Sequence, residues 1–106
     1  MNKSRLEQLL KFYAEDPNDP FTIYAMANEY KVFDHDKALF FFEILIRDHP
    51  NYIATYYHLG YLYLEMGDEE KAKSTFEKGM KIAAANNEEL ALRELKNAYD
   101  EFMMDY

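Results

Sequence analysis

The sequence contains no cysteine, and glycine and proline each occur only three times in 106 residues. The lack of cysteine excludes disulfides, thiolate nucleophiles and cysteine-based zinc sites. It also agrees with a reducing compartment, so we expect a cytoplasmic protein. No run of about 18 uncharged apolar residues is present, and the charged amino-terminal segment lacks the apolar stretch of a signal peptide. We therefore expect no membrane span.

Clusters of lysine and arginine are missing as well. The formal net charge is −8 and the isoelectric point is near 4.8. Nucleic acids and anionic membranes are bound through clustered basic side chains, so both are disfavoured as partners. Apolar residues, in contrast, are abundant: 49% of the chain is hydrophobic and 17% is aromatic. This composition predicts one globular domain with a substantial core.

Apolar residues recur at the 3.6-residue spacing of amphipathic helices along most of the chain. This spacing predicts about six helices, of which the first covers 3–15, the second 21–32 and the fourth 52–66. The three prolines fall between these apolar segments, where proline ends one helix or begins the next.

Short polar residues mark the starts of the remaining helices. Asp34 and Asp68 are the expected N-caps of the third and fifth helices, and Gly67 suits the end of the fourth because glycine tolerates positive φ. Asn86 and Glu89 have the spacing of a capping box, which would open a final helix.

Residue types also repeat at intervals of 33 to 34 residues. A shift of 34 places Ala38, Phe42, Glu43 and Arg47 on Ala72, Phe76, Glu77 and Lys81. A shift of 33 places Ile23, Tyr24, Met26, Ala27 and Tyr30 on Tyr56, Tyr57, Leu59, Gly60 and Tyr63. The same shift aligns 6–17 with 39–50, so the first helix matches the second helix of a pair. A fixed period of this length is typical of stacked helix-pair repeats.

The second of these repeats resembles the tetratricopeptide repeat. The residues that carry the resemblance are Tyr56, Leu59, Gly60, Tyr63, Gly67, Asp68, Ala72 and Phe76. A weaker copy consists of Ile23, Met26, Ala27, Tyr30, Ala38, Phe42 and Pro50. Two positions depart from the family pattern, because Gly79 stands where alanine is usual and Ala84 where proline is usual. The last helix does not match the pattern cleanly, and the resemblance covers about residues 20–86.

The resemblance implies an all-α fold in which antiparallel helix pairs stack as a right-handed superhelix. Residues 1–106 would then form a single domain with four parts. These are an amino-terminal half-repeat helix at 3–15, a first repeat at 20–50, a second repeat at 51–86 and a carboxy-terminal capping helix at 87–104. The first helix of each pair would line a concave face.

The resemblance further implies a non-catalytic module that binds a protein or peptide in a tyrosine-lined groove. The side chains expected to line it lie off the packed stripes: Phe21, Tyr24, Asn28, Lys31, Tyr57, His58, Tyr61 and Leu64. The family's carboxylate clamp uses a set of lysine, asparagine and arginine side chains. Here the groove offers only Asn28 and Lys31 beside the tyrosines, so we expect no such clamp.

Three alternatives remain open from the sequence. The aromatic side chains can pack beneath the first or last helix, as ordinary core residues do. A homodimer can form through the tyrosine face or through the apolar edge of the last helix, at Phe102, Met103, Met104 and Tyr106. An enzyme is the third alternative, and only the histidines support it.

The histidines nevertheless have plain structural interpretations. His35 lies between two aspartates in a helix-capping turn, and His49 precedes Pro50 in a turn where we expect it to be exposed. His58 lies beside the expected groove. Adjacent residues in a turn point in different directions and no second cluster of ligands is evident, so we expect no metal, cofactor or catalysis.

Overall fold

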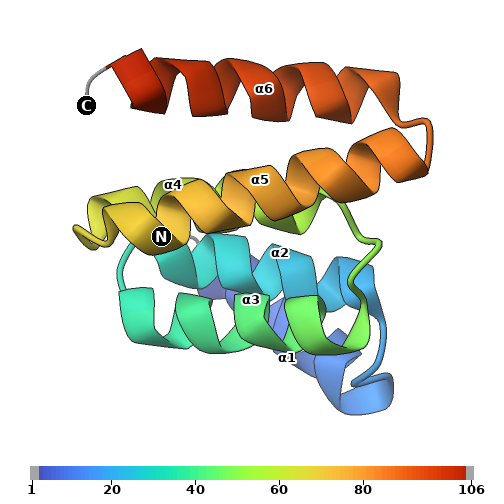
Figure 1. The fold of residues 1–106 in the computed structure, drawn as a ribbon. Coiled ribbons are helices and arrows are strands. Elements are labelled where there is room, and N and C mark those ends of the chain that lie inside the picture. The colour runs from blue at the N-terminus through green and yellow to red at the C-terminus, as the bar shows by residue number, and fades with distance from the viewer. Residues whose placement is uncertain (1–2, 105–106) are drawn as a thin grey trace. The chain divides into compact units, whose positions relative to one another are not determined.

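The computed structural model describes residues 3–104, and this part of the chain forms six α-helices and no strand (Figure 1). The helices are α1 (Lys3–Glu15), α2 (Pro20–Lys31), α3 (His35–Asp48), α4 (Ala54–Glu65), α5 (Glu69–Ala85) and α6 (Glu89–Met104). The predicted all-α fold class is confirmed. None of these helices is both long enough and apolar enough to cross a membrane.

The chain divides into two compact units, Met1–Tyr52 and Ile53–Tyr106. The first contains α1, α2 and α3, and the second contains α4, α5 and α6. The division falls in the turn where the sequence repeat predicts one helix pair to end and the next to begin. There Tyr52 N–H donates to the His49 carbonyl at 3.0 Å, and α4 starts at Ala54, two residues later than predicted.

In the first unit, α2 packs against both α1 and α3. The α2–α3 pair is the more extensive, and small and large side chains alternate in it. Ala27 and Ala38 are fully buried, as are Met26, Phe42 and Leu45. Small residues permit close approach of the helices, and the larger side chains fill the space beside them.

In the second unit, α5 packs against α4 and α6, and α4 also contacts α6. Two glycines lie where the helices come closest. A Cβ atom at Gly60 would overlap the ring of Phe76, which is fully buried. A Cβ atom at Gly79 would lie 2.5 Å from Tyr56 Cβ and 3.1 Å from Leu95 Cδ1. Any side chain at position 56 would carry this Cβ atom, so the close approach of α4 and α5 explains why glycine replaces the alanine that is usual at position 79.

The ends of α4 and α5 share one backbone motif, although their sequences differ. Gly67 has a φ of 79°, and Asp68 N–H donates to the Tyr63 carbonyl at 2.8 Å. Asn87 has a φ of 57°, and Glu88 N–H donates to the Ala83 carbonyl at 2.9 Å. Both are Schellman endings, in which a left-handed residue lets the chain leave the helix.

The prediction of a capping box that starts at Asn86 is wrong. Because Asn87 takes the left-handed position, Asn86 is the C-cap of α5, and its N–H reaches the Ile82 carbonyl at 3.0 Å. The next helix begins only at Glu89. Among residue types, asparagine is second only to glycine in how readily it adopts the left-handed conformation. The two asparagines at this point therefore indicate a turn.

Replacing Gly67 by alanine is expected to lower the free energy of unfolding by about 1 to 2 kcal/mol. No atom of the described residues lies within 4 Å of the added methyl group, so the loss would come from the left-handed backbone alone. Urea denaturation measures it. The matched variant Asn87→Gly should leave stability unchanged or raise it slightly, and an undiminished stability in Gly67→Ala would contradict the assigned helix ending.

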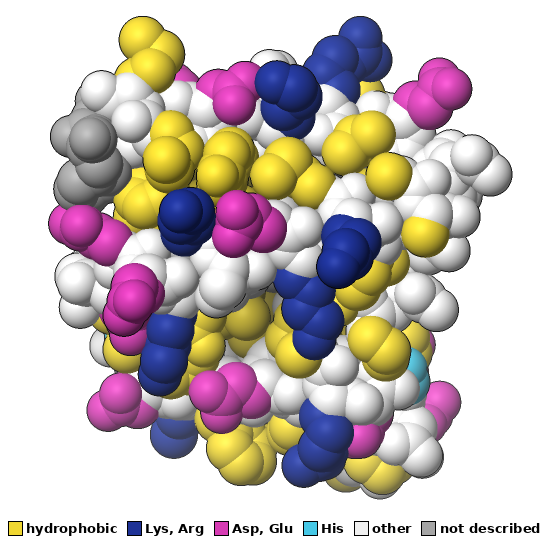
Figure 2. Space-filling model, in the orientation of Figure 1, with side chains coloured by type: hydrophobic (Ala, Val, Ile, Leu, Met, Phe, Trp, Pro, Cys, Tyr) yellow, Lys and Arg dark blue, Asp and Glu magenta, His cyan; other side chains and the backbone are white. Residues whose placement is uncertain are grey.

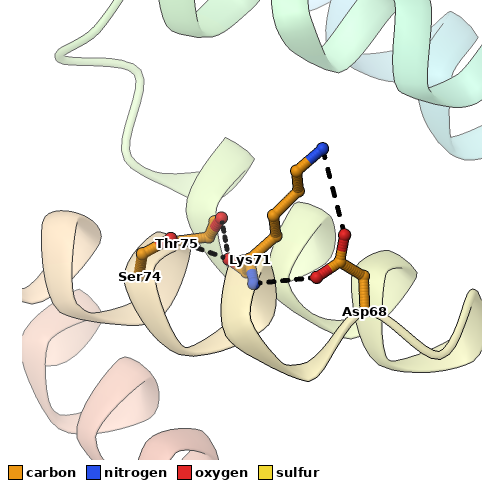
Figure 3. Close-up of polar contacts among 4 residues, drawn as sticks. All are labelled: Asp68, Lys71, Ser74 and Thr75. Atoms are coloured by element: carbon orange, nitrogen blue, oxygen red, sulfur yellow. Dashed lines mark hydrogen bonds and ion pairs between the residues drawn. The ribbon is translucent and has the colours of Figure 1, made fainter.

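The predicted N-caps are confirmed. Asp34 accepts a hydrogen bond from Lys37 N–H at 3.1 Å, and Asp68 accepts one from Lys71 N–H at the same distance. Figure 3 shows the second of these caps, in which the Lys71 ammonium also approaches the Asp68 carboxylate at 3.9 Å. One turn further, Thr75 Oγ1 donates to the Lys71 carbonyl at 2.7 Å. Because the Asp68 side chain accepts a hydrogen bond from a free backbone N–H group of the first turn, α5 begins at a defined residue.

Helix α6 has one apolar face and one polar face. Its buried side chains are Leu95, Ala98 and Phe102, whereas its charged side chains are exposed. In Figure 2, acidic and basic side chains are interspersed over α5 and α6, with hydrophobic side chains between the two helices. A helix of this kind can cover an apolar surface and present a soluble one.

Candidate functional site

Two tyrosines of α4 lie together on its surface. Tyr57 and Tyr61 are one helical turn apart, and their ring centroids are separated by 5.1 Å. The Tyr61 ring also meets the buried Phe76 edge-on, at 5.5 Å. Tyr56 and Tyr63 occupy the buried stripe of the same helix, so Tyr57 and Tyr61 remain half-buried.

A cavity of about 350 Å³ lies beside Tyr61, between α4 and α6. The described residues that line it are Tyr61, Leu64, Ala98, Glu101, Phe102 and Met104. It is an open hollow, and its lining combines four apolar side chains with Tyr61 and Glu101.

The polar groups of this cavity belong to Tyr61 and Glu101. The Tyr61 hydroxyl donates to Glu101 Oε2 at 3.4 Å, which is long for an O–H···O hydrogen bond. Burial, and then the neighbouring Tyr57 and Glu101, raise the pKa of Tyr61 to about 12. The phenol is therefore a neutral hydrogen-bond donor near neutral pH.

The last helix covers the tyrosine face only in part. Helix α6 covers Tyr61 in part, and a hollow remains between the two helices. The predicted residues Tyr61 and Leu64 both line this hollow. Tyr57 lies against Tyr61 and against the ring of His58, which it meets edge-on at 5.3 Å.

Sequence reasoning did not identify the residues that α6 contributes. Glu101 and Ala98 are not among the residues predicted to bind, and the binding prediction for Phe102 and Met104 concerns an edge for self-association. The amphipathic period of α6 predicts which of its faces is buried. It does not predict that the last two turns of α6 lie beside Tyr61, which is distant in the chain.

In the first unit, one predicted residue on α2 lines a hollow of similar size: Phe21 borders a hollow of about 360 Å³ between α1 and α2, whereas Tyr24, Asn28 and Lys31 are not part of its lining. Phe21 is 61% exposed, whereas Tyr24, Asn28 and Lys31 are half-buried. The Tyr24 ring packs against Tyr52, with centroids 5.5 Å apart.

Two further groups on this unit are affected by burial. Desolvation, and then the neighbouring Tyr24 and Asp19, raise the pKa of Tyr52 above its ordinary value. The side-chain oxygen of Asn28 is buried and accepts no hydrogen bond from the described residues. An unsatisfied buried acceptor is unfavourable, so a donor that reached Asn28 would be stabilising.

The histidines do not converge. His35 is the first residue of α3, and His58 packs on Tyr57. His49 is not exposed as expected: it is half-buried as the C-cap of α3, and its buried Nε2 atom has no hydrogen-bond partner among residues 3–104. Across residues 3–104, no three side chains of histidine, cysteine, aspartate or glutamate gather where they could hold a metal ion.

The residues of the expected apolar edge of the last helix do not share one environment, because some are buried and others are exposed. Phe102 is 7% exposed and belongs to the core of the second unit, whereas Met104 is 86% exposed and Met103 is also exposed. Tyr106 lies outside the described residues. Phe102 thus cannot contribute to a surface patch while α6 keeps this packing.

Solved structures share this arrangement of helices. A crystal structure of a tetratricopeptide repeat domain protein from Salinibacter ruber is 37% identical, with a TM-score of 0.75, and the alignment covers 80% of this chain and 96% of that one. The chain belongs to the tetratricopeptide repeat family. A solution NMR structure of such a domain protein from the same organism is 39% identical, with a TM-score of 0.78 and coverage of 82% and 89%.

Two further comparisons agree with membership of the tetratricopeptide repeat family. The family model for the tetratricopeptide repeat matches residues 53–86, which is the second helix pair. The crystal structure of MamA has a TM-score of 0.67 over 93% of this chain and 65% of that one, and at 22% identity it is similar in fold. No curated protein sequence matches the chain. Tetratricopeptide repeat proteins are generally non-catalytic scaffolds for protein partners, and this fold suggests such a role.

Proposed function

We propose that this tetratricopeptide repeat protein binds a protein or peptide through the tyrosine face of α4 and the adjoining hollow against α6. The proposal rests on one observation above all, the cavity of about 350 Å³ that Tyr61 lines, with the Tyr57 ring packed against Tyr61. Half-exposed aromatic side chains next to a hollow are typical of the anchor points of protein interfaces.

The face of α2, in the first unit, is proposed as a separate binding surface. Tyr24 is the repeat equivalent of Tyr57, and the exposed Phe21 lies on the same helix. The domain would consist of a half-repeat helix, repeats at 20–50 and 51–86, and the cap at 87–104. The binding protein would act in the cytoplasm as a scaffold without catalysis, metal or cofactor, and without nucleic acid or membrane as a partner.

The double variant Tyr57→Ala, Tyr61→Ala is expected to weaken binding of a captured partner by about tenfold or more, because truncated aromatic anchors commonly cost more than 1 kcal/mol each. Partners recovered by affinity capture and identified by mass spectrometry are purified, and their dissociation constants are measured by calorimetry. Circular dichroism establishes that the variant remains folded.

Tyr99→Ala is the matched control. Tyr99 is a half-buried tyrosine of α6 that donates to Glu77 of α5 at 3.3 Å and does not line the cavity. We expect it to leave partner binding unchanged. If the double variant kept its partners while folded, the proposed binding face would be wrong.

Self-association is the second candidate function, because the same tyrosines could join two copies. Light scattering across a dilution series distinguishes the two. A dimer that the double variant converts to a folded monomer would assign the tyrosine face to an oligomer contact. A monomer with partners that depend on the two tyrosines supports the scaffold.

A further inference from the structure

We infer that the cavity between α4 and α6 receives an arginine side chain from a basic segment of the partner. The inference rests on the proposed function and adds the chemical class of the bound residue. It follows from the lining of the cavity and from the distribution of charge around it.

The lining matches the two parts of an arginine side chain. Leu64, Ala98, Phe102 and Met104 are apolar and can contact the aliphatic stem. Arginine commonly buries its stem along apolar surface while its charged end reaches polar groups. Those groups are present here as the Glu101 carboxylate and the Tyr61 ring and hydroxyl.

The charge around the cavity has a single sign. Glu101 is the charged residue among the described lining residues, and none of them is basic. Helix α4 contains Glu65 and no lysine or arginine, and α6 contains no basic residue after Lys96, whose ammonium is 3.0 Å from Asp100. The other lysines of this unit are on α5, at positions 71, 73, 78 and 81.

The Glu101 carboxylate is available to a cation. Within residues 3–104 no lysine or arginine is paired with it, and its contact with the Tyr61 hydroxyl is long at 3.4 Å. Leu64 and Met104 belong to the last turns of α4 and α6, which run in the same direction because each is joined to α5 by a short turn. Helix carboxyl ends favour positive charge.

An uncharged apolar side chain would fit this cavity less well. It would remove water from Glu101 without offering a partner, and a desolvated unpaired carboxylate is unfavourable. Arginine supplies a planar, multiply donating group that can bond the carboxylate and stack on an aromatic ring, which lysine does less effectively.

The test is an NMR titration with small probes. We expect N-acetyl-argininamide to shift the backbone amides of Leu64, Ala98 and Glu101, and the equivalent citrulline amide, which has nearly the same shape without charge, to shift them less. Glu101→Gln should weaken arginine binding about three- to fivefold, in the range of a partly exposed ion pair. Glu94→Gln, on α6 but outside the cavity lining, should leave it unchanged.

The inference would be overturned by equal shifts with arginine and citrulline, by binding that is insensitive to Glu101→Gln, or by arginine shifts spread over acidic surfaces away from the cavity. Stronger binding of N-acetyl-leucinamide would replace the arginine by an apolar occupant. None of these results bears on the proposed function, which is tested separately by the binding of a captured partner to the Tyr57→Ala, Tyr61→Ala double variant.

Discussion

Replacing Phe76 by alanine is expected to lower the free energy of unfolding by about 3 to 5 kcal/mol. Phe76 is 0% exposed, and it lies against Gly60 of α4 and edge-on to Tyr61. The substitution removes apolar contact area and leaves a cavity that two helices cannot readily close, because their separation is set by other side chains. Urea denaturation followed by circular dichroism measures the loss.

Phe40→Ala is the matched control, because Phe40 is 58% exposed on α3. We expect it to cost about 1 kcal/mol or less, as surface substitutions usually do. Equal losses at the two positions would contradict the packing of α5 on α4. Because the chain forms two compact units, Phe76→Ala is also expected to separate the unfolding of the second unit from that of the first.

Replacing Gly60 by alanine is expected to lower the free energy of unfolding by about 1 to 2 kcal/mol, although the same change in an exposed helix raises it by up to about 1 kcal/mol. Three ring atoms of Phe76 lie within 2.7 Å of the position that the new Cβ would take. The ring is buried and cannot turn away freely. Gly60→Leu would overpack the pair further and cost more.

Whether Gly60→Ala lowers or raises the free energy of unfolding depends on the Phe76 ring. A double-mutant cycle can show this dependence. In a Phe76→Leu background the overlap is relieved, and Gly60→Ala is expected to be neutral or stabilising because alanine is the better helix former. Thermal melts of the four proteins measure the coupling. A single variant Gly60→Ala as stable as the parent would mean that the helices are not in the close contact described.

Much of the fold follows from local sequence. The six helices, the caps at Asp34 and Asp68, and the positive φ of Gly67 are each set by a few neighbouring residues. Gly60 and Phe76 both belong to the repeat pattern, and their contact follows because helices joined by a short turn pack together. The role of Asn86 was predicted wrongly, since asparagine is favoured both at N-caps and where a helix ends in a left-handed residue, and only the backbone path distinguishes the two.

The candidate site was predicted only in part, because it depends on contacts between segments that are distant in the chain. Periodicity places Tyr57 and Tyr61 off the buried stripe of α4, and this determines that they are surface residues. Whether a surface residue is covered depends on which other helix lies over it. Tyr61 and Glu101 belong to different helices far apart in the chain, and their contact arises only when α6 packs on α5 and reaches α4.

The sequence by itself therefore determined the helices, their pairing into repeats and the two classes of tyrosine, because each follows from spacing within one or two helical turns or one repeat. Only the tertiary structure decided that α6 covers Tyr61 incompletely and leaves a hollow lined by Glu101. The physical reason is that burial and cavities are produced by packing between distant segments, whose side-chain volumes must match in space and leave no local trace in the sequence.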